Sequence, residues 1–295
     1  RDGEQYRAVI FNIETQQRRM LDKPVANVDP TGRYGLSINF NRLFDFRPGY
    51  GYAGVVDPYS DEKHPKEDGI FLIDMKSGTS RLIISLDQIW EYTKNSFKGK
   101  DKKILINHIT FNADGSRFVF LVRNFPEEGE RWKTAILTAN TDGSDIFMLS
   151  DYSYASHYHW RDEEHIVFHA RCEEGSSLGD QLYVLKDKTH IVEAIDPDFF
   201  LRDGHCSYSP NREWMLYDSY PDKENYRHLY LYNLKHKKGV ELGQYYSYPV
   251  TIVDIRCDLH PRWNPDGTAI SFDSTHEGQR HVYYADLREV MKSLT

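Results

Sequence analysis

The sequence predicts an all-β fold and, within that class, a β-propeller of six or seven blades with four antiparallel strands each. Four segments that place a histidine three residues before an aromatic residue recur along the 295-residue chain, at spacings of 49, 48 and 55 residues. Each is followed by a polar turn and short apolar strands. Repeats of roughly 40–50 residues with four strands per unit are typical of propeller blades, and the 21 tyrosines favour strands over helices.

The first two predicted strands span residues 8–13 and 18–21. They resemble the third and fourth strands of a blade whose first two strands are absent from the sequence. Because a half blade leaves an exposed sheet edge, we expect the natural domain to continue before Arg1 and to close its ring there, or strands from elsewhere to close it. Residues 1–295 are thus expected to form one propeller domain, a half blade followed by five full blades.

The first full blade is predicted to begin near Val25, which stands where the later units carry histidine. Its strands are expected at 35–40, 70–74 and 81–84, after a turn at 29–32. The stretch 41–69 is an insertion rich in Gly, Pro and aromatic residues, and long loops in compact domains are often binding loops. A short helix is expected at 87–94.

The later blades follow the same plan. Their strands are predicted at 118–122, 135–138, 166–169, 182–185, 206–208, 214–217, 229–232, 240–242, 269–272 and 282–285. Asp-Gly turns at 114–115 and 266–267 join successive strands, because glycine accepts the positive φ that tight hairpin turns require.

The repeated histidines are His108, His157, His205 and His260. Equivalent positions of a circular repeat converge on one axis, so we expect these side chains to share a central pocket. The alternative is that each ties neighbouring blades together by hydrogen bonds, since buried polar groups are normally satisfied in this way. Val25 in the first blade indicates that the repeat does not itself require histidine.

A metal site is predicted from His205, Cys257 and His260, which come from adjacent blades. Imidazole and thiolate are good zinc ligands, and a four-coordinate site needs three or four such groups. Asp258 or His157 would complete the set.

The other two cysteines are expected to pack between blades. Cys206 follows His205 directly, so on a strand it points to the opposite face, and Cys172 is expected to be a core residue. Three cysteines cannot all pair, and their number gives no disulfide framework.

A further group of side chains is predicted to act on a substrate. The catalytic candidates are His108, His157, Tyr158 and Arg171, and the substrate-binding candidates are Tyr154, His159, Arg202 and Arg262. A His, a Tyr and an Arg around one pocket suit removal of a proton α to a carboxylate, because His or Tyr moves the proton while Arg or a metal offsets the charge. The structural alternatives are aromatic packing for Tyr and ion pairs for Arg.

Several functions are disfavoured by the sequence. A net charge of −8 and a pI of about 5.9 do not predict a nucleic-acid partner, and no apolar stretch approaches the ~18 residues that suggest a membrane span. Gly-x-Ser-x-Gly, phosphate-binding Gly loops and His-Glu-x-x-His are all absent from the sequence. A hydrolase that uses paired carboxylates stays open, although nothing singles out a pair.

The segments Ser209-Pro210-Asn211 to Tyr217 and Asn264-Pro265-Asp266-Gly267 to Phe272 resemble the repeats of propeller polysaccharide lyases. The oligogalacturonate lyases and the propeller-type ulvan lyases are the families that the chain is similar to, over about residues 25–287. The resemblance implies an acidic oligo- or polysaccharide as the partner, and a periplasmic or secreted location.

In oligogalacturonate lyases a metal is held by histidines of neighbouring blades and a Gln-x-x-His-x-His segment. By that resemblance His205 is the lone histidine, and Cys257-x-x-His260-x-Arg262 is the segment, with Cys for Gln and Arg for the last His. This departure favours zinc over manganese.

The likeness to ulvan lyases implies further roles. His108 would be a catalytic histidine, and Tyr158 or Tyr154 with Arg171 would supply the Tyr and Arg. A second catalytic histidine is expected near 121–124, where this chain has Leu-Val-Arg-Asn.

We therefore predict a lyase that cleaves uronic-acid-containing glycans by β-elimination and carries a divalent metal at the propeller axis. The alternative is a non-catalytic propeller that binds a glycan or a protein partner and in which zinc holds the blades together.

Overall fold

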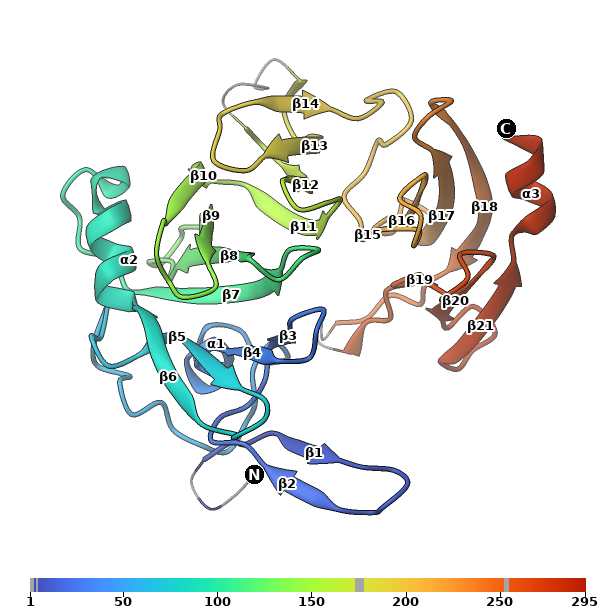
Figure 1. Cartoon of the computed structure of the whole chain (residues 1–295). Coiled ribbons are helices and arrows are strands. Elements are labelled where there is room, and N and C mark those ends of the chain that lie inside the picture. The colour runs from blue at the N-terminus through green and yellow to red at the C-terminus, as the bar shows by residue number, and fades with distance from the viewer. Residues whose placement is uncertain (1–2, 4, 173–177, 252–254) are drawn as a thin grey trace. The chain divides into compact units, whose positions relative to one another are not determined.

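The computed structural model describes residues 3, 5–172, 178–251 and 255–295. The chain divides into two compact units, residues 1–154 and 155–295, called here the N-terminal and the C-terminal unit. Each consists mainly of antiparallel sheets (Figure 1). Each unit is described by itself below.

The N-terminal unit holds a hairpin, two four-stranded sheets and three short helices. The strands are β1 (Val9–Phe11) and β2 (Arg18–Met20) in the hairpin, β3 (Asn27–Val28), β4 (Tyr34–Ser37), β5 (Gly69–Asp74) and β6 (Ser80–Ser85) in one sheet, and β7 (Ile104–Phe111), β8 (Arg117–Asn124), β9 (Thr134–Asn140) and β10 (Phe147–Ser153) in the other. The helices are α1 (Phe40–Phe46), α2 (Leu86–Thr93) and the 3-10 helix η1 (Lys94–Phe97).

The C-terminal unit holds two four-stranded sheets, one three-stranded sheet and a final helix. The strands are β11 (Ala155–Trp160), β12 (His165–Ala170), β13 (Gln181–Lys186) and β14 (Val192–Ala194), then β15 (Cys206–Tyr208), β16 (Trp214–Asp218), β17 (Tyr226–Asn233) and β18 (Lys238–Tyr246), then β19 (Arg262–Trp263), β20 (Ala269–Ser274) and β21 (His281–Asp286). Helix α3 (Arg288–Ser293) ends the unit.

In every sheet the strands pair antiparallel in chain order, as expected for propeller blades. The predicted strands after Val25 each overlap an observed strand. Among the described residues four sheets have four strands, one has three and the first has two. In the three-stranded sheet, helix α3 follows the last strand β21. The number of blades in a closed ring stays a prediction.

Neighbouring sheets within each unit pack through their first strands. In the N-terminal unit β3 lies next to β7, and in the C-terminal unit β15 lies next to both β11 and β19. In the N-terminal unit every residue of β8, an inner strand of its sheet, is buried. This stacking brings the starts of successive first strands close together within a unit, and it is what positions the candidate site.

The same turn contact recurs between sheets in both units. Gly115 and Gly267 each have positive φ, at +76° and +65°. A Cβ on Gly115 would meet Pro30 at 3.3 Å, and one on Gly267 would meet Pro210 at 3.1 Å. The Asp-Gly turn of one sheet thus packs against the proline turn of the sheet before it.

The insertion between β4 and β5 begins with a helix that the sequence did not predict. Asn39 caps α1 by accepting hydrogen bonds from the backbone N–H groups of Asn41 and Arg42, so the predicted strand 35–40 ends at Ser37 instead. The guanidinium of Arg42 is buried and donates to the backbone carbonyls of Ile104, Glu62 and Lys63. These bonds fix the inserted chain onto β7.

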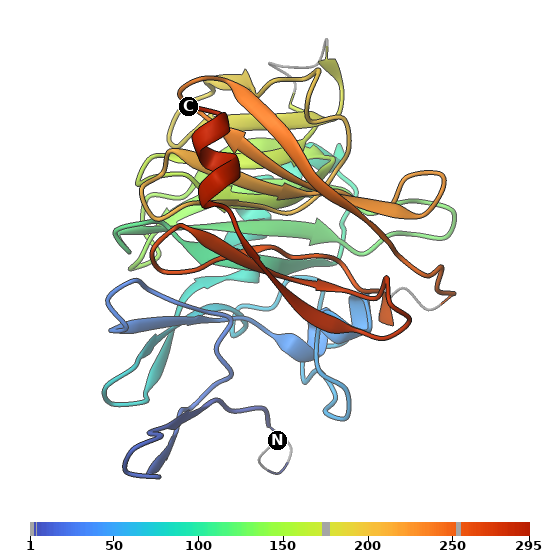
Figure 2. The ribbon, with the colours of Figure 1, turned by 90° about the vertical axis from the view of Figure 1, so that its right-hand side faces the viewer.

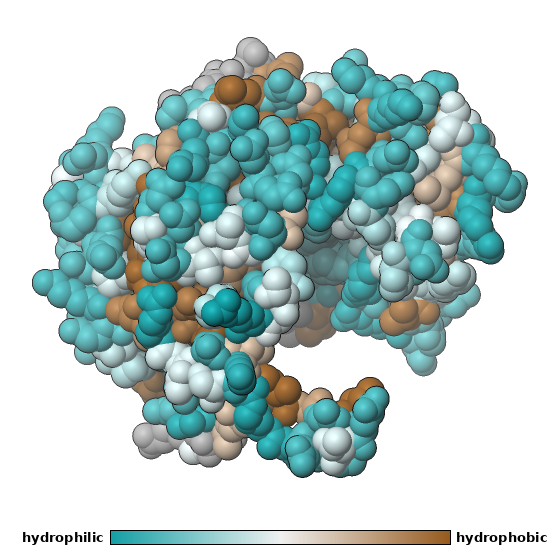
Figure 3. Space-filling view, viewed as in Figure 1, coloured by the Kyte–Doolittle hydropathy of each residue, from teal (hydrophilic) through white to brown (hydrophobic). Residues whose placement is uncertain are grey.

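Helix α3 follows β21 and lies beside the sheet of β15–β18 (Figure 2). Its apolar residues Val290 and Met291 pack against a core cluster that includes Trp214 and Phe272. On the face drawn in Figure 3, hydrophilic residues cover most of the surface and hydrophobic residues form small separate patches. Among the helices of the described residues, none is long and apolar enough to cross a membrane.

Candidate active site

Three of the four repeated histidines meet at one end of the sheets in the C-terminal unit. His157 lies in β11, His205 directly precedes β15, and His260 lies shortly before β19. The ring centroids of His157 and His205 are 3.9 Å apart, and those of His205 and His260 are also 3.9 Å apart. His157 falls at a register shift of β11, and His260 has a φ of +42°. Such irregularities re-aim side chains next to active sites.

Asp218 is the anchor of this group, although the sequence did not single it out. It ends β16, is fully buried, and accepts hydrogen bonds from the backbone N–H of His205 at 2.6 Å and of His260 at 2.9 Å. Its carboxylate also lies 3.0 Å from the Nδ1 of His205. The ladder pairs Cys206 with Tyr217, so His205 stands opposite Asp218. The prediction from the sequence did not use this strand register, which places Asp218 next to His205.

The electrostatics shift the pKa values of the two neighbouring imidazoles, His205 and His260, in opposite directions. Burial opposes a charge on His205, but Asp218 outweighs it and raises the pKa of His205 above its usual value. Burial also works against Asp218, yet His205 and backbone N–H groups lower the pKa of that carboxyl. Burial and the neighbouring His205 lower the pKa of His260 to about 4. His260 is therefore neutral at neutral pH and keeps a lone pair for a ligand.

His157 is held from both ring nitrogens. Its Nδ1 lies 3.0 Å from Oδ1 of Asp203, and its Nε2 lies 3.2 Å from the hydroxyl of Tyr220. The same hydroxyl accepts a hydrogen bond from Nη2 of Arg256 at 2.9 Å. A carboxylate that binds Nδ1 fixes the tautomer and makes Nε2 the basic nitrogen. The arrangement can therefore move a proton, with an arginine beside the phenol.

Three ligand atoms in this group are spaced as metal ligands. The donor atoms of His205, Asp258 and His260 all lie within 4.8 Å of one another. Asp218 at Nδ1 of His205 is the outer-shell carboxylate that metal-bound histidines commonly have, and His260 is neutral as a ligand must be. Two imidazoles with a carboxylate fit a divalent metal, but they suit zinc and manganese alike.

Asp258 also has protein partners of opposite charge. Its carboxylate oxygens lie 2.7 Å from Nη2 of Arg227 and 2.8 Å from Nε of Arg256. Cys257, by contrast, is not one of the three grouped ligands in the described part of the chain. Its thiol lies 3.8 Å from the carbonyl of Asp258, and burial raises its pKa. The thiol is thus protonated when no metal is bound, and its role as a metal ligand stays a prediction.

The other predicted residues of the C-terminal unit have partners outside this group. The ring of Tyr158 stacks on Phe168, and the imidazole of His159 lies 2.7 Å from the carbonyl of Trp160. Arg171 is exposed and pairs with Asp180, and Arg262 pairs with Asp273. Arg202 is exposed. Burial lowers the pKa of His159. Sequence reasoning did not single out Tyr220, whose hydroxyl lies 3.2 Å from Nε2 of His157, or Arg256, which binds that hydroxyl.

His108 and Tyr154 belong to the N-terminal unit. His108 is exposed, has a φ of +54° and sits at a bulge in β7. Its ring centroid lies 5.7 Å from that of Tyr50, whose hydroxyl accepts a hydrogen bond from Arg47 at 3.0 Å. Tyr154 is an exposed residue after β10.

Comparisons with known proteins agree with the fold. No protein-family model matches the chain, and no curated protein does. An oligogalacturonate lyase in complex with manganese is 17% identical, with a TM-score of 0.64 over 96% of this chain and 72% of that one. An oligogalacturonate lyase from Vibrio parahaemolyticus is 16% identical, with a TM-score of 0.63 and the same coverage.

The fold is also similar to that of TolB from Acinetobacter baumannii, at 14% identity and a TM-score of 0.52, covering 97% of this chain and 58% of that one. The chain has a propeller-like fold. Because lyases and TolB share it, the fold leaves the function open, and the site has to decide it.

Proposed function

We propose that the protein is a lyase that cleaves uronic-acid-containing oligo- or polysaccharides by β-elimination. The observation that carries the proposal is the placement of His157 between Asp203 and Tyr220, next to the possible metal ligands His205 and His260. Groups that move a proton and groups that offset a carboxylate charge are the two requirements of this reaction. The structural similarity to oligogalacturonate lyases supports it.

In the proposed reaction His157 is the base. Its Nε2, opposite the Asp203-bound Nδ1, takes the proton from the sugar carbon α to the carboxylate. The electron pair of that C–H bond forms the double bond to the neighbouring carbon, and the bond from that carbon to the glycosidic oxygen breaks. The hydroxyl of Tyr220 gives its proton to this oxygen, and Arg256 stabilises the resulting phenolate by its hydrogen bond.

His205, Asp258 and His260 would hold a divalent metal beside this pair. The chemistry that a metal supplies there is neutralisation of the substrate carboxylate, which makes the α proton more acidic. Arg256 binds both Tyr220 and Asp258, so it couples the proton-transfer pair to the metal ligands. His108, with Tyr50 and Arg47, stays a proposed substrate contact of the N-terminal unit.

The test is product formation on a panel of uronans, with manganese or zinc added. The measurement is the ultraviolet absorbance of the unsaturated uronate. His157→Gln is expected to lower the rate by a factor of about 10²–10⁴, the usual contribution of a general base. His165→Gln is the matched control, because His165 is bound to Asp162 in a turn of the same sheet and is expected to leave the rate unchanged.

The proposal is wrong if no uronan gives the absorbance with either metal, or if His157→Gln is as active as the wild type. His108→Ala tests the role of the N-terminal unit in the same assay. Cleavage without a double bond would indicate a hydrolase instead.

One observation favours the second candidate, a non-catalytic propeller with a structural metal. His205 and His260 precede the first strands of two neighbouring sheets, so a metal that they share with Asp258 would hold these sheets together. In that case a chelator lowers the melting temperature, a glycan or protein partner still binds, and no substrate is cleaved.

A further inference from the structure

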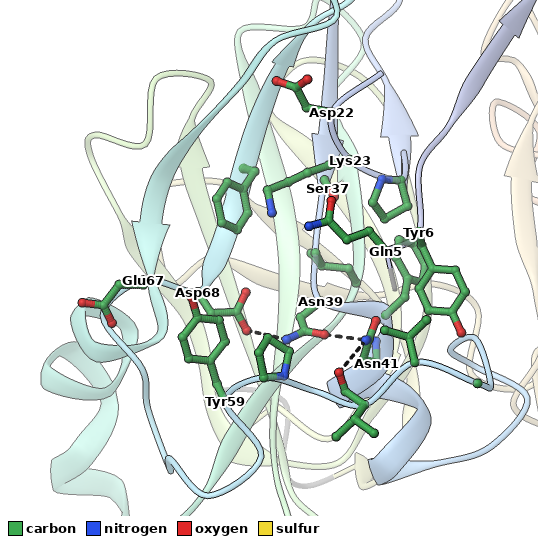
Figure 4. A pocket seen from close by; sticks show the side chains of 18 residues that line it. Gln5, Tyr6, Asp22, Lys23, Ser37, Asn39, Asn41, Tyr59, Glu67 and Asp68 are labelled. Carbon is green, nitrogen blue, oxygen red and sulfur yellow. Dashed lines mark hydrogen bonds between the residues drawn. The ribbon is translucent and has the colours of Figure 1, made fainter. Parts of the chain in front are cut away.

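The N-terminal unit contains a separate cavity that the proposed lyase chemistry does not use. It has a volume of about 640 Å³ and lies between the segment before β3, the end of β4 and the inserted chain before β5. Figure 4 shows Lys23, Asn39 and Asp68 around this hollow, with Tyr59 beside them. We call it the Lys23 pocket. Its volume lies within the range of roughly 300–1,000 Å³ that small-molecule sites occupy.

Lys23 brings a positive charge into the pocket that the protein does not pair directly. Its ammonium lies 3.8 Å from the ring centroid of Phe71. Burial lowers the pKa of Lys23, although Asp68 and Asp22 act in the opposite direction. Among the residues that the structure describes, its ammonium makes no ion pair or side-chain hydrogen bond, so its donors are available to a ligand.

Asp68 supplies the acceptor in the pocket. It is buried, and its carboxylate accepts a hydrogen bond from Nδ2 of Asn39 at 2.7 Å. The same amide donates to Asp57 at 2.8 Å, so Asn39 is fixed between two carboxylates. Burial raises the pKa of Asp68, although hydrogen bonds from Asn39 and from the backbone of Gly69 act in the opposite direction. A donor and an acceptor thus line one cavity without bonding to each other.

Ser37 adds an independent sign of a ligand. It lines the same pocket and is only 1% exposed. In the described part of the chain its hydroxyl has no hydrogen-bond partner. A buried hydroxyl without a partner costs free energy, and a polar ligand in the pocket would remove that cost.

We propose that the Lys23 pocket binds an uncharged sugar ring. A sugar hydroxyl accepts from Lys23 while another donates to Asp68 or Ser37, and the rings of Tyr6, Tyr59 and Phe71 supply apolar contact. Asp22, Glu67 and Asp68 outnumber the one lysine in the lining. This negative excess disfavours a uronate, so the site would recognise neutral units rather than the acidic ones on which the proposed lyase acts.

The test uses the full chain and five neutral sugars, namely galactose, glucose, mannose, rhamnose and xylose, with galacturonate as the charged comparison. Saturation-transfer NMR detects binding and calorimetry gives the affinity. We expect at least one neutral sugar to bind, and Lys23→Met and Ser37→Ala each to weaken it, the lysine variant by at least about tenfold. Lys76→Met is the matched control, because Lys76 is exposed in the β5–β6 turn.

Melting temperatures of all variants show whether they fold. If Lys23→Met does not fold, Ser37→Ala still tests whether the sugar binds in the Lys23 pocket. The proposal is overturned if none of the five sugars binds, if galacturonate binds in their place, or if a bound sugar is insensitive to the folded pocket variants. His157→Gln is expected to keep the sugar affinity of the wild type, so failure of the lyase proposal would not be mistaken for failure of this one.

Discussion

The two units use the same end of a sheet in different ways. In the C-terminal unit the residue before the first strand and the residue that ends the second, His205 and Asp218, bind each other. In the N-terminal unit the corresponding places hold Ala26 and Ser37. Ser37 lines the Lys23 pocket, and its hydroxyl has no hydrogen-bond partner among the described residues. One unit thus closes its polar groups into a network, and the other leaves a hydroxyl open to a ligand.

The difference shows what a repeated sheet fixes and what it leaves to the individual residue. In every sheet the start of the first strand lies beside the end of the antiparallel second strand. The side chains at these two places therefore lie close together. Whether they form a network depends on complementary charge. A network preorganises groups for proton transfer, whereas an open pair of donor and acceptor binds a polar ligand.

The largest effect is expected from breaking the network. Asp218→Ala removes a buried carboxylate that three donors share. Loss of one partner of a buried ion pair leaves the other uncompensated, so the free energy of unfolding should fall by about 3–5 kcal/mol. Chemical denaturation measures this. Asp266→Ala, in an exposed turn, should change it by less than about 0.5 kcal/mol, and equal losses would refute the network.

The next effect is stabilisation by metal. If His205, Asp258 and His260 form a metal site, manganese or zinc at a hundred times its Kd should stabilise the protein by about 2.7 kcal/mol. The melting temperature should rise for the wild type and for His236→Gln, an exposed control, but not for His260→Gln. A rise that survives in His260→Gln would place the ion elsewhere.

A smaller effect is expected from pH in the presence of a chelator. The pKa of His260 is lowered to about 4 in the folded protein, so its contribution to stability is complete above about 6.5 and is lost as the pH falls toward 4. The raised pKa of His205 has the opposite sign: its contribution is complete below about 6.5 and is lost as the pH rises past the folded value.

The measurement is the melting temperature from pH 7 to pH 4. His260→Gln should lose less stability than the wild type over this range, because it cannot bind the proton that destabilises the fold. His236→Gln should follow the wild type. Parallel curves for all three proteins would show that His260 titrates normally.

The smallest effect is expected in the Lys23 pocket. Without ligand, Ser37→Ala removes a hydroxyl that has no partner in the described part of the chain. The free energy of unfolding should therefore change by less than about 0.5 kcal/mol or rise slightly. A large loss in denaturation would mean that Ser37 is part of a structural network, as Asp218 is.

The sequence was sufficient to predict most strands, because alternation and turn chemistry are local. The Asp-Gly turn before β20 is an example: Gly267 needs a positive φ, and only nearby residues decide that. Helix α1 was not predicted, since its cap Asn39 acts within a loop whose path depends on the buried Arg42. Helix α3, which follows β21, was not predicted either.

At the site, the spacing of His157, His205 and His260 predicted their meeting, because one position in each repeat packs next to its equivalent. Tyr220 and Arg256 were missed since both lie in loops outside the repeated pattern. Tyr158 was predicted from its place beside His157 in the sequence. Its ring stacks on Phe168 in the structure, and its role in the site stays a prediction.

The sequence by itself determined where the strands and turns lie and that three histidines occupy matched positions, since both follow from short-range periodicity. Only the tertiary structure decided which acids, phenols and arginines surround those histidines, and that Lys23 and Ser37 line a cavity. The physical reason is that such partners come from segments far apart in the chain, and their distances depend on strand register and loop path, which no local pattern encodes.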